Sequence, residues 1–159
     1  MAEQGDIAAD AAGQPIVGRS RHGALTLDQL AALQPGLGRL MPEISDRYWI
    51  LYYAAQAGHW RLAGYQLRQV RNLMMIGATT RPAQAQRLSD FTAHYLGPIE
   101  KAIMAEDFAA FDQAFRASVT AVNAYHVETG HPEIVWQLPD EPPKHLALRA
   151  DGGQARHEP

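Results

Sequence analysis

The chain has 159 residues and no cysteine, and its 14 Lys and Arg against 17 Asp and Glu give a formal charge of -3. This length is typical of one domain that holds its core without a disulfide or a structural metal. The missing cysteines exclude thiol catalysis, thiolate zinc sites, iron–sulfur clusters and thioether-bound haem, and the small negative charge argues against a nucleic-acid partner.

Both ends of the chain are expected to be mobile tails. Residues 1–23 mix Gly, Ala, Gln, Asp and Pro without a period, and residues 150–159 are polar and contain adjacent glycines. The N-terminal stretch lacks the regions of a secretory signal, and the longest apolar run, Tyr48 to Ala55, is far shorter than the ~20 residues that cross a membrane. We therefore expect a cytoplasmic protein with no membrane segment, folded over residues 24–149.

The residues between these tails follow a helical period, and no window alternates as a half-buried strand does. A short lead helix is predicted from Thr26 to Leu33, with Thr26 as its N-cap and Gln34-Pro35-Gly36 as its end. The first long helix is predicted from Pro42 to Ala57, before Gly58. Its buried positions, spaced by threes and fours, are Ile44, Tyr48, Leu51, Tyr52 and Ala55.

Three further long helices are predicted. The second runs from Trp60 to Ile76 and ends at Gly77, and the third begins at Pro82 with a kink at Gly97-Pro98. The fourth starts near Asp107 and ends before Gly130. Its apolar stripe is Phe108, Phe111, Phe115, Val119, Val122 and His126.

Because each of these stripes needs partners to cover it, the economical fold is an all-α, antiparallel four-helix bundle. The prolines and aromatic residues that follow, from Ile134 to Pro143, predict an extended strap laid back over the bundle. Trp136 is its expected anchor.

His126 is the most informative candidate for a functional residue, because it continues the apolar stripe of the fourth helix and should face the interior. Such a histidine is either a neutral core imidazole bonded to a backbone carbonyl or a tyrosine, or a metal or haem ligand. The periodicity leaves both interpretations open.

Two stretches of the chain resemble the cytochrome c-prime-like four-helix cytochromes. Val122-Asn123-Ala124-Tyr125-His126, followed by Gly130-His131-Pro132, Ile134 and Pro139, is similar to that family's C-terminal haem-attachment region, where the pattern is Cys-x-x-Cys-His. Leu40-Met41 and the stretch from Leu51 to Tyr65 are similar to its first helical hairpin. The resemblance covers about Leu37 to Pro139.

The resemblance implies a haem inside the bundle, with His126 as its proximal ligand and Met41 as the candidate distal ligand. Val122 and Tyr125 stand where the family has its cysteines, so this haem would be b-type and held without a covalent bond. The implied function is electron transfer or small-gas sensing. The alternative is a haem-free interaction or scaffold module descended from the same fold.

The remaining candidate residues indicate a functional site less strongly than His126. Glu128 and His131 have the Glu-x-x-His spacing of di-iron bundles, but such sites need two of these motifs. His59 and His94 are expected at a boundary and on the surface. The arginines of the second helix, Arg61, Arg68 and Arg71, predict a solvated face, with haem propionates or a docking partner as the alternative.

No motif names a catalysed reaction, so we do not expect an enzyme.

The first long helix is apolar over more than one face, because Trp49 and Tyr53 lie away from Tyr48 and Tyr52. This surplus and the family resemblance predict a homodimer through the first two long helices. The electron-transfer function that the resemblance implies also predicts a redox partner.

Overall fold

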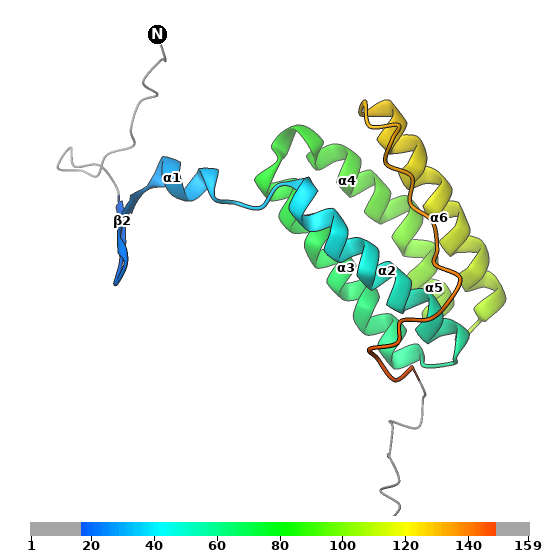
Figure 1. Cartoon of the computed structure of the whole chain (residues 1–159). Coiled ribbons are helices and arrows are strands. Elements are labelled where there is room, and N and C mark those ends of the chain that lie inside the picture. The colour runs from blue at the N-terminus through cyan, green and yellow to red at the C-terminus, as the bar shows by residue number, and fades with distance from the viewer. Residues whose placement is uncertain (1–16, 149–159) are drawn as a thin grey trace, which may run out of the picture. The chain divides into compact units, whose positions relative to one another are not determined.

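The computed structural model describes residues 17–148, most of them helical (Figure 1). By its internal contacts the chain divides into two compact units, with the division between Pro35 and Gly36. The tails predicted at residues 1–16 and 149–159 lie outside the described residues. Among residues 17–148, none of the helices combines the length and the apolar character that crossing a bilayer requires.

The first unit contains a β-hairpin and a short helix. Strands β1 (Val17–Ser20) and β2 (Gly23–Thr26) pair antiparallel, and α1 (Leu27–Ala32) follows directly. The predicted cap is confirmed, because the Thr26 hydroxyl accepts from the backbone N–H of Gln29 at 3.2 Å and the Gln29 side chain accepts from that of Thr26 at 2.9 Å.

The hairpin was not predicted, and it moves residues 17–23 out of the expected irregular tail. Each strand has four residues, which is too short for an alternating pattern to stand out in a sequence. Gly23 lies at a φ of 130°, a region that favours glycine, directly after the turn at Arg21-His22.

The second unit holds the long helices, which lie side by side in Figure 1. They share one hydrophobic core whose fully buried large side chains include Leu51, Val70, Leu96, Ile99, Phe111 and Phe115. In chain order the elements are α2 (Leu37–Gln56), α3 (Trp60–Thr80), the 3-10 turn η1 (Pro82–Gln84), α4 (Ala85–Phe91), the π-helical turn η2 (Thr92–Leu96), α5 (Gly97–Met104) and α6 (Phe108–Glu128).

Helix α2 begins earlier than predicted. Gly36 precedes it, and Pro42 lies inside the helix rather than at its start. Proline there removes one N–H bond to the carbonyl of Gly38, which is exposed, so water can satisfy that oxygen. As a consequence Met41 is a helical residue on the second turn of α2.

The end predicted for the second long helix is wrong: α3 continues past Gly77 to Thr80, and Gly77 is buried within it. In the third segment a π-helical turn over Thr92–Leu96 directly precedes Gly97-Pro98, where the kink is predicted, and α5 begins at Gly97.

After α6 the chain forms the predicted strap, defined here as residues 134–143, and Trp136 is its anchor. The Trp136 indole N–H donates to the Ser45 hydroxyl at 2.8 Å, and its ring packs edge-on against Tyr48 and Phe115. Farther along, the Trp49 indole N–H donates to the Glu141 carbonyl and the Tyr53 hydroxyl donates to the Pro139 carbonyl, both at 2.7 Å.

These contacts explain the wide apolar surface of α2. Trp49 and Tyr53, the residues that suggested a homodimer contact, bind the strap of their own chain. The surplus aromatic surface therefore needs no second copy to cover it, and the dimer stays a prediction.

Candidate functional site

A pocket of about 710 Å³ opens between α2, α6 and the first residues of the strap. Its walls come from the first three turns of α2, the C-terminal half of α6 and residues 131–136, with Met74 of α3 and Phe91 of α4 at its base. Its size is in the range of ligand pockets, roughly 300–1,000 Å³. The lining is largely apolar and contains no Asp, Glu, Lys or Arg.

Three of the four residues predicted to bind a cofactor line this pocket. Met41 reaches it from α2, and Val122 and His126 reach it from α6. Tyr125 does not line it; its ring packs against Phe91 and lies under the Arg87 guanidinium, 5.8 Å from the ring centre. Burial raises the pKa of the Tyr125 phenol, which stays neutral.

His126 is half-buried on the pocket wall rather than sealed in the core. The buried positions of α6 are Phe111, Phe115, Ser118 and Ala121, so the stripe rotates away from His126 toward the end of the helix. The Nδ1 atom of His126 lies 2.8 Å from the carbonyl oxygen of Ile134. A carbonyl only accepts hydrogen bonds, so Nδ1 carries the proton and the neutral ring keeps its lone pair on Nε2.

Both interpretations of His126 from the sequence fit this bond. A core imidazole would be satisfied by a backbone carbonyl, and a metal-ligating histidine commonly donates its other ring N–H to one as well. What distinguishes His126 is its surroundings, because the side chain borders a pocket that it shares with the thioethers of Met41 and Met74.

A buried polar pair lies beside the pocket. The Tyr48 hydroxyl donates to the Ser118 hydroxyl at 3.4 Å, and Ser118 donates to the Phe115 carbonyl at 2.6 Å. Burial raises the pKa of Tyr48 well above its ordinary value, so the phenol that lines the pocket is uncharged. The pocket lining therefore gains no charge from this polar pair.

Among the described residues, His59 and His94 have the boundary and surface positions that the sequence predicts. His59 is the N-cap of α3, where its ring accepts from the backbone N–H of Leu62 at 3.3 Å. His94 is exposed, and its Nδ1 lies 2.9 Å from the Asp90 carbonyl. His131 pairs with Glu133 at 3.3 Å and also borders the pocket.

The described residues give no support for a metal site built from carboxylate and histidine ligands. Within residues 17–148 no group of three or more His, Asp or Glu side chains is arranged to hold a metal ion. Glu128, the first half of the Glu-x-x-His spacing, faces Arg87 at 3.9 Å.

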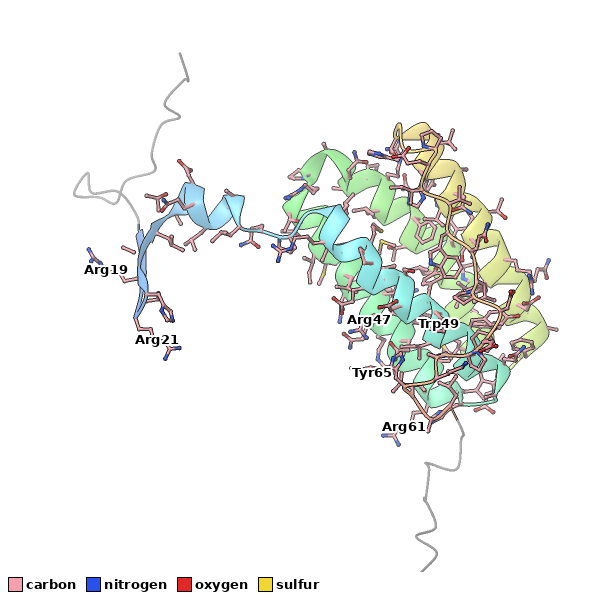
Figure 2. The ribbon with its side chains drawn as sticks, in the orientation of Figure 1. Arg19, Arg21, Arg47, Trp49, Arg61 and Tyr65 are labelled. Atoms are coloured by element: carbon pink, nitrogen blue, oxygen red, sulfur yellow. The ribbon has the colours of Figure 1, made fainter. Side chains whose placement is uncertain are left out.

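The arginine-rich face of α3 lies apart from the pocket. Arg61 and Arg68 are exposed and form no ion pair with the described residues, whereas Arg71 pairs with Glu100 at 2.9 Å. Figure 2 shows Arg61, Tyr65 and Arg47 on the same side of the α2–α3 hairpin. None of these arginines lines the pocket, so they do not reach a carboxylate bound inside it.

The part that several residues play in the pocket was not predicted from the sequence. Ile134, Val135 and Trp136, predicted only as part of the strap, and Met74, predicted only as part of a core stripe, line the pocket. Asn123, next to the pocket, binds the backbone of Trp136. These roles depend on the path of the strap, which the sequence marks as extended but does not align with α6.

The donor set of the pocket fits a haem held without covalent bonds. His126 supplies a lone pair on Nε2, Met41 and Met74 supply thioethers, and the remaining lining is mostly aliphatic and aromatic. The lining offers no Lys or Arg for the propionates, and His131, which pairs with Glu133, is the one lining residue besides His126 that can carry a positive charge.

The fold and this pocket define a mostly helical protein with a largely apolar pocket whose lining contains no Asp, Glu, Lys or Arg. Comparisons of the chain with protein-family models, with curated proteins and with solved structures found no match.

Proposed function

We propose that this protein is a four-helix bundle of the cytochrome c-prime-like type that binds haem b in the pocket between α2, α6 and the strap. The observation that carries the proposal is the hydrogen bond from His126 Nδ1 to the Ile134 carbonyl at 2.8 Å, in the wall of a largely apolar pocket that Met41 also lines. This bond leaves Nε2 as the ligating atom of His126.

Each side chain has a defined part in such a site. His126 provides the iron ligand, and the Ile134 carbonyl holds its ring in orientation and makes it a stronger base. Val122, Phe91 and Trp136 exclude water from the bound ring. Haem supplies one-electron chemistry or an open iron position for a small gas.

The role of Met41 decides which of the two functions, electron transfer or small-gas sensing, the site would perform. If its sulfur is the second ligand, the iron has no open position, which suits electron transfer and favours a higher reduction potential. If Met41 only packs against the ring, one position is left for a gas. The placement of Met41 on the pocket wall supports the first alternative, and the presence of Met74 in the same pocket offers a second thioether.

The test is a titration of the full chain with hemin, followed in the visible spectrum. We expect a saturable Soret band, and we expect His126→Ala to weaken hemin affinity by more than about 100-fold, because even loss of an outer-shell partner costs up to that much. His94→Ala is the matched control, since His94 makes the same kind of bond to a carbonyl but lies on the exposed surface. Equal spectra for both variants would refute haem ligation by His126.

A second variant, Met41→Leu, keeps the volume of the side chain and removes the sulfur. We expect the reduced, hemin-loaded variant to bind carbon monoxide faster than the unsubstituted protein if Met41 is a ligand. An unchanged reduced spectrum would remove Met41 from the ligand set and leave the role of His126 intact.

The alternative proposal is a haem-free interaction module. Its expected docking surface, the aromatic face of α2, is covered by the strap, which weakens it. A homodimer through α2 and α3 remains a separate proposal. Sedimentation of the full chain with and without hemin tests it directly.

A further inference from the structure

We propose that Asn123 is the positioning residue of this site, and that it sets the tautomer of His126 by fixing the strap. The inference concerns the protein without any ligand, and only its last experimental arm rests on the proposed haem function. Asn123 lies on α6, three residues before His126, and is not part of the pocket lining.

The Asn123 side chain binds one residue of the strap at both of its backbone groups. Its Nδ2 atom donates to the Trp136 carbonyl at 3.0 Å, and its Oδ1 atom accepts from the Trp136 N–H at 2.8 Å. The extended strap has no neighbouring strand to bind its backbone, so the Asn123 side chain makes both hydrogen bonds to Trp136 that a strand would make. It is half-buried, where a lost partner is costly.

Fixing Trp136 also fixes the carbonyl that His126 needs. Ile134 lies two residues earlier, and the segment that joins it to α6 is short and bonded at both ends. The His131 N–H donates to the His126 carbonyl at 2.8 Å, and the Ile134 N–H donates to the His131 carbonyl at 3.0 Å. With Trp136 held by Asn123 on the other side, the Ile134 carbonyl has little freedom to leave Nδ1.

The consequence is a single protonation pattern on the ring. A neutral imidazole carries its proton on either nitrogen, and the hydrogen bond of one nitrogen decides which form is present. The Ile134 carbonyl selects the form with Nδ1–H and a lone pair on Nε2. Without Asn123, the strap would no longer hold that carbonyl in place and both forms would be populated.

The experiment reads the two His126 ring nitrogens by nitrogen-15 NMR in the ligand-free full chain, at about pH 9, above the ordinary titration range of imidazole. In the unsubstituted protein we expect Nδ1 to resonate as a protonated nitrogen and Nε2 as one with a lone pair. In Asn123→Ala we expect both resonances to move toward their common average. Unmoved resonances in a folded Asn123→Ala protein would overturn the proposal.

Two controls separate positioning from general loosening. His94, bonded to the Asp90 carbonyl within its own helix, should keep its resonances in every variant. Tyr53→Phe removes one strap bond, to Pro139, and leaves Asn123 untouched, so it should not move the His126 resonances. If Tyr53→Phe moves them as far as Asn123→Ala does, Asn123 has no special role.

Should Asn123→Ala fail to fold, Asn123→Asp carries the test. A carboxylate still accepts from the Trp136 N–H but cannot donate to its carbonyl, so the His126 resonances should shift part of the way. No shift in this variant contradicts the proposal as well.

The last arm adds hemin. If the proposed function holds, Asn123→Ala should raise the hemin dissociation constant by about tenfold, the usual cost of removing an outer-shell partner. A tautomer shift without hemin binding in any variant would refute the haem function alone. Hemin binding without a tautomer shift would refute the role of Asn123 alone.

Discussion

Two glycines of α3 differ in how closely the neighbouring side chains approach them. At Gly77 an added Cβ would lie 2.9 Å from Leu37 Cδ2 and 3.3 Å from Leu88 Cδ1, so α3 uses the missing side chain to approach α2 and α4. At Gly64 the nearest atoms, on Arg68 and Ile103, lie at 3.6 and 3.7 Å, which is ordinary contact. Of the two, only at Gly77 would a neighbouring side chain have to move to admit a Cβ.

We therefore expect opposite effects of alanine at these two positions. Gly77→Ala should lower the free energy of unfolding by about 1–3 kcal/mol through overpacking. Gly64→Ala should raise it by up to about 1 kcal/mol, because alanine favours the helix and restricts the unfolded chain. Urea denaturation followed by circular dichroism measures both, and a stabilised Gly77→Ala protein would contradict the close approach at Gly77.

Gly77 also shows where sequence reasoning about single residues ends. A glycine in a sequence indicates only that the residue has no side chain. A helix end was predicted at Gly77 because glycine often terminates helices. Whether the position needs backbone freedom or space depends on Leu37 and Leu88, which are distant in the chain. His126 could be found because helical spacing places it on the apolar stripe of the last long helix, and Met41 and Val122 because the family resemblance implied them, whereas Asn123 depends on a partner in the strap.

Helices α2 and α6 are joined by a polar cluster at the edge of the core. The Asp112 carboxylate accepts from Arg116 Nε at 2.8 Å and from the Tyr52 hydroxyl at 2.8 Å. The Arg116 guanidinium is the main cause that holds the pKa of Asp112 below its usual range, with the Tyr52 bond adding to it. Burial, and then Asp112 itself, raise the pKa of Tyr52.

This cluster predicts a pH dependence of stability with a defined sign. The pKa of Asp112 is lower in the folded state, so its contribution is present above the unfolded-state value, about 4, and is lost as the pH falls through the folded-state value. The stability difference between the unsubstituted protein and Asp112→Asn should therefore shrink on acidification. Chemical denaturation at a series of pH values measures it.

The control for this series is Asp46→Asn, which removes an exposed carboxylate of α2 that has no ion pair among the described residues. Its pH profile should follow that of the unsubstituted protein. If the two aspartate variants behave alike, the bonds of Asp112 to Arg116 and Tyr52 do not stabilise the α2–α6 contact.

Among the elements, those with local signals were predictable. Thr26 caps α1 as predicted, since a side-chain oxygen can be matched to an N–H three residues on, and α6 begins directly after Asp107, near which its start was predicted. The π-helical turn at Thr92–Leu96 and the early start of α2 were not, because both depend on how proline is accommodated by the surrounding packing. The strap was predicted as extended, but three of the side chains that bind it, Ser45, Trp49 and Tyr53, belong to α2, far away in the chain.

At the scale of the whole molecule, the core lies entirely on one side of the division at Pro35 and Gly36. Every buried residue of the hydrophobic cluster belongs to the segment from Leu40 onward, whereas α1 buries none. A two-stranded hairpin and a helix of six residues are each marginal in water without such burial. The second unit therefore holds the interactions that make folding favourable.

A fragment from Gly36 to Leu148 should accordingly fold by itself. We expect its thermal midpoint within about 3 °C of the full chain, the shift that ~1 kcal/mol causes in a domain of this size. A peptide of residues 17–35 should show neither helix nor strand by circular dichroism. Hemin affinity of the fragment should equal that of the full chain, because all pocket residues lie in the second unit. A fragment that melts far below the full chain would show that the first unit contributes to the core despite its lack of buried residues.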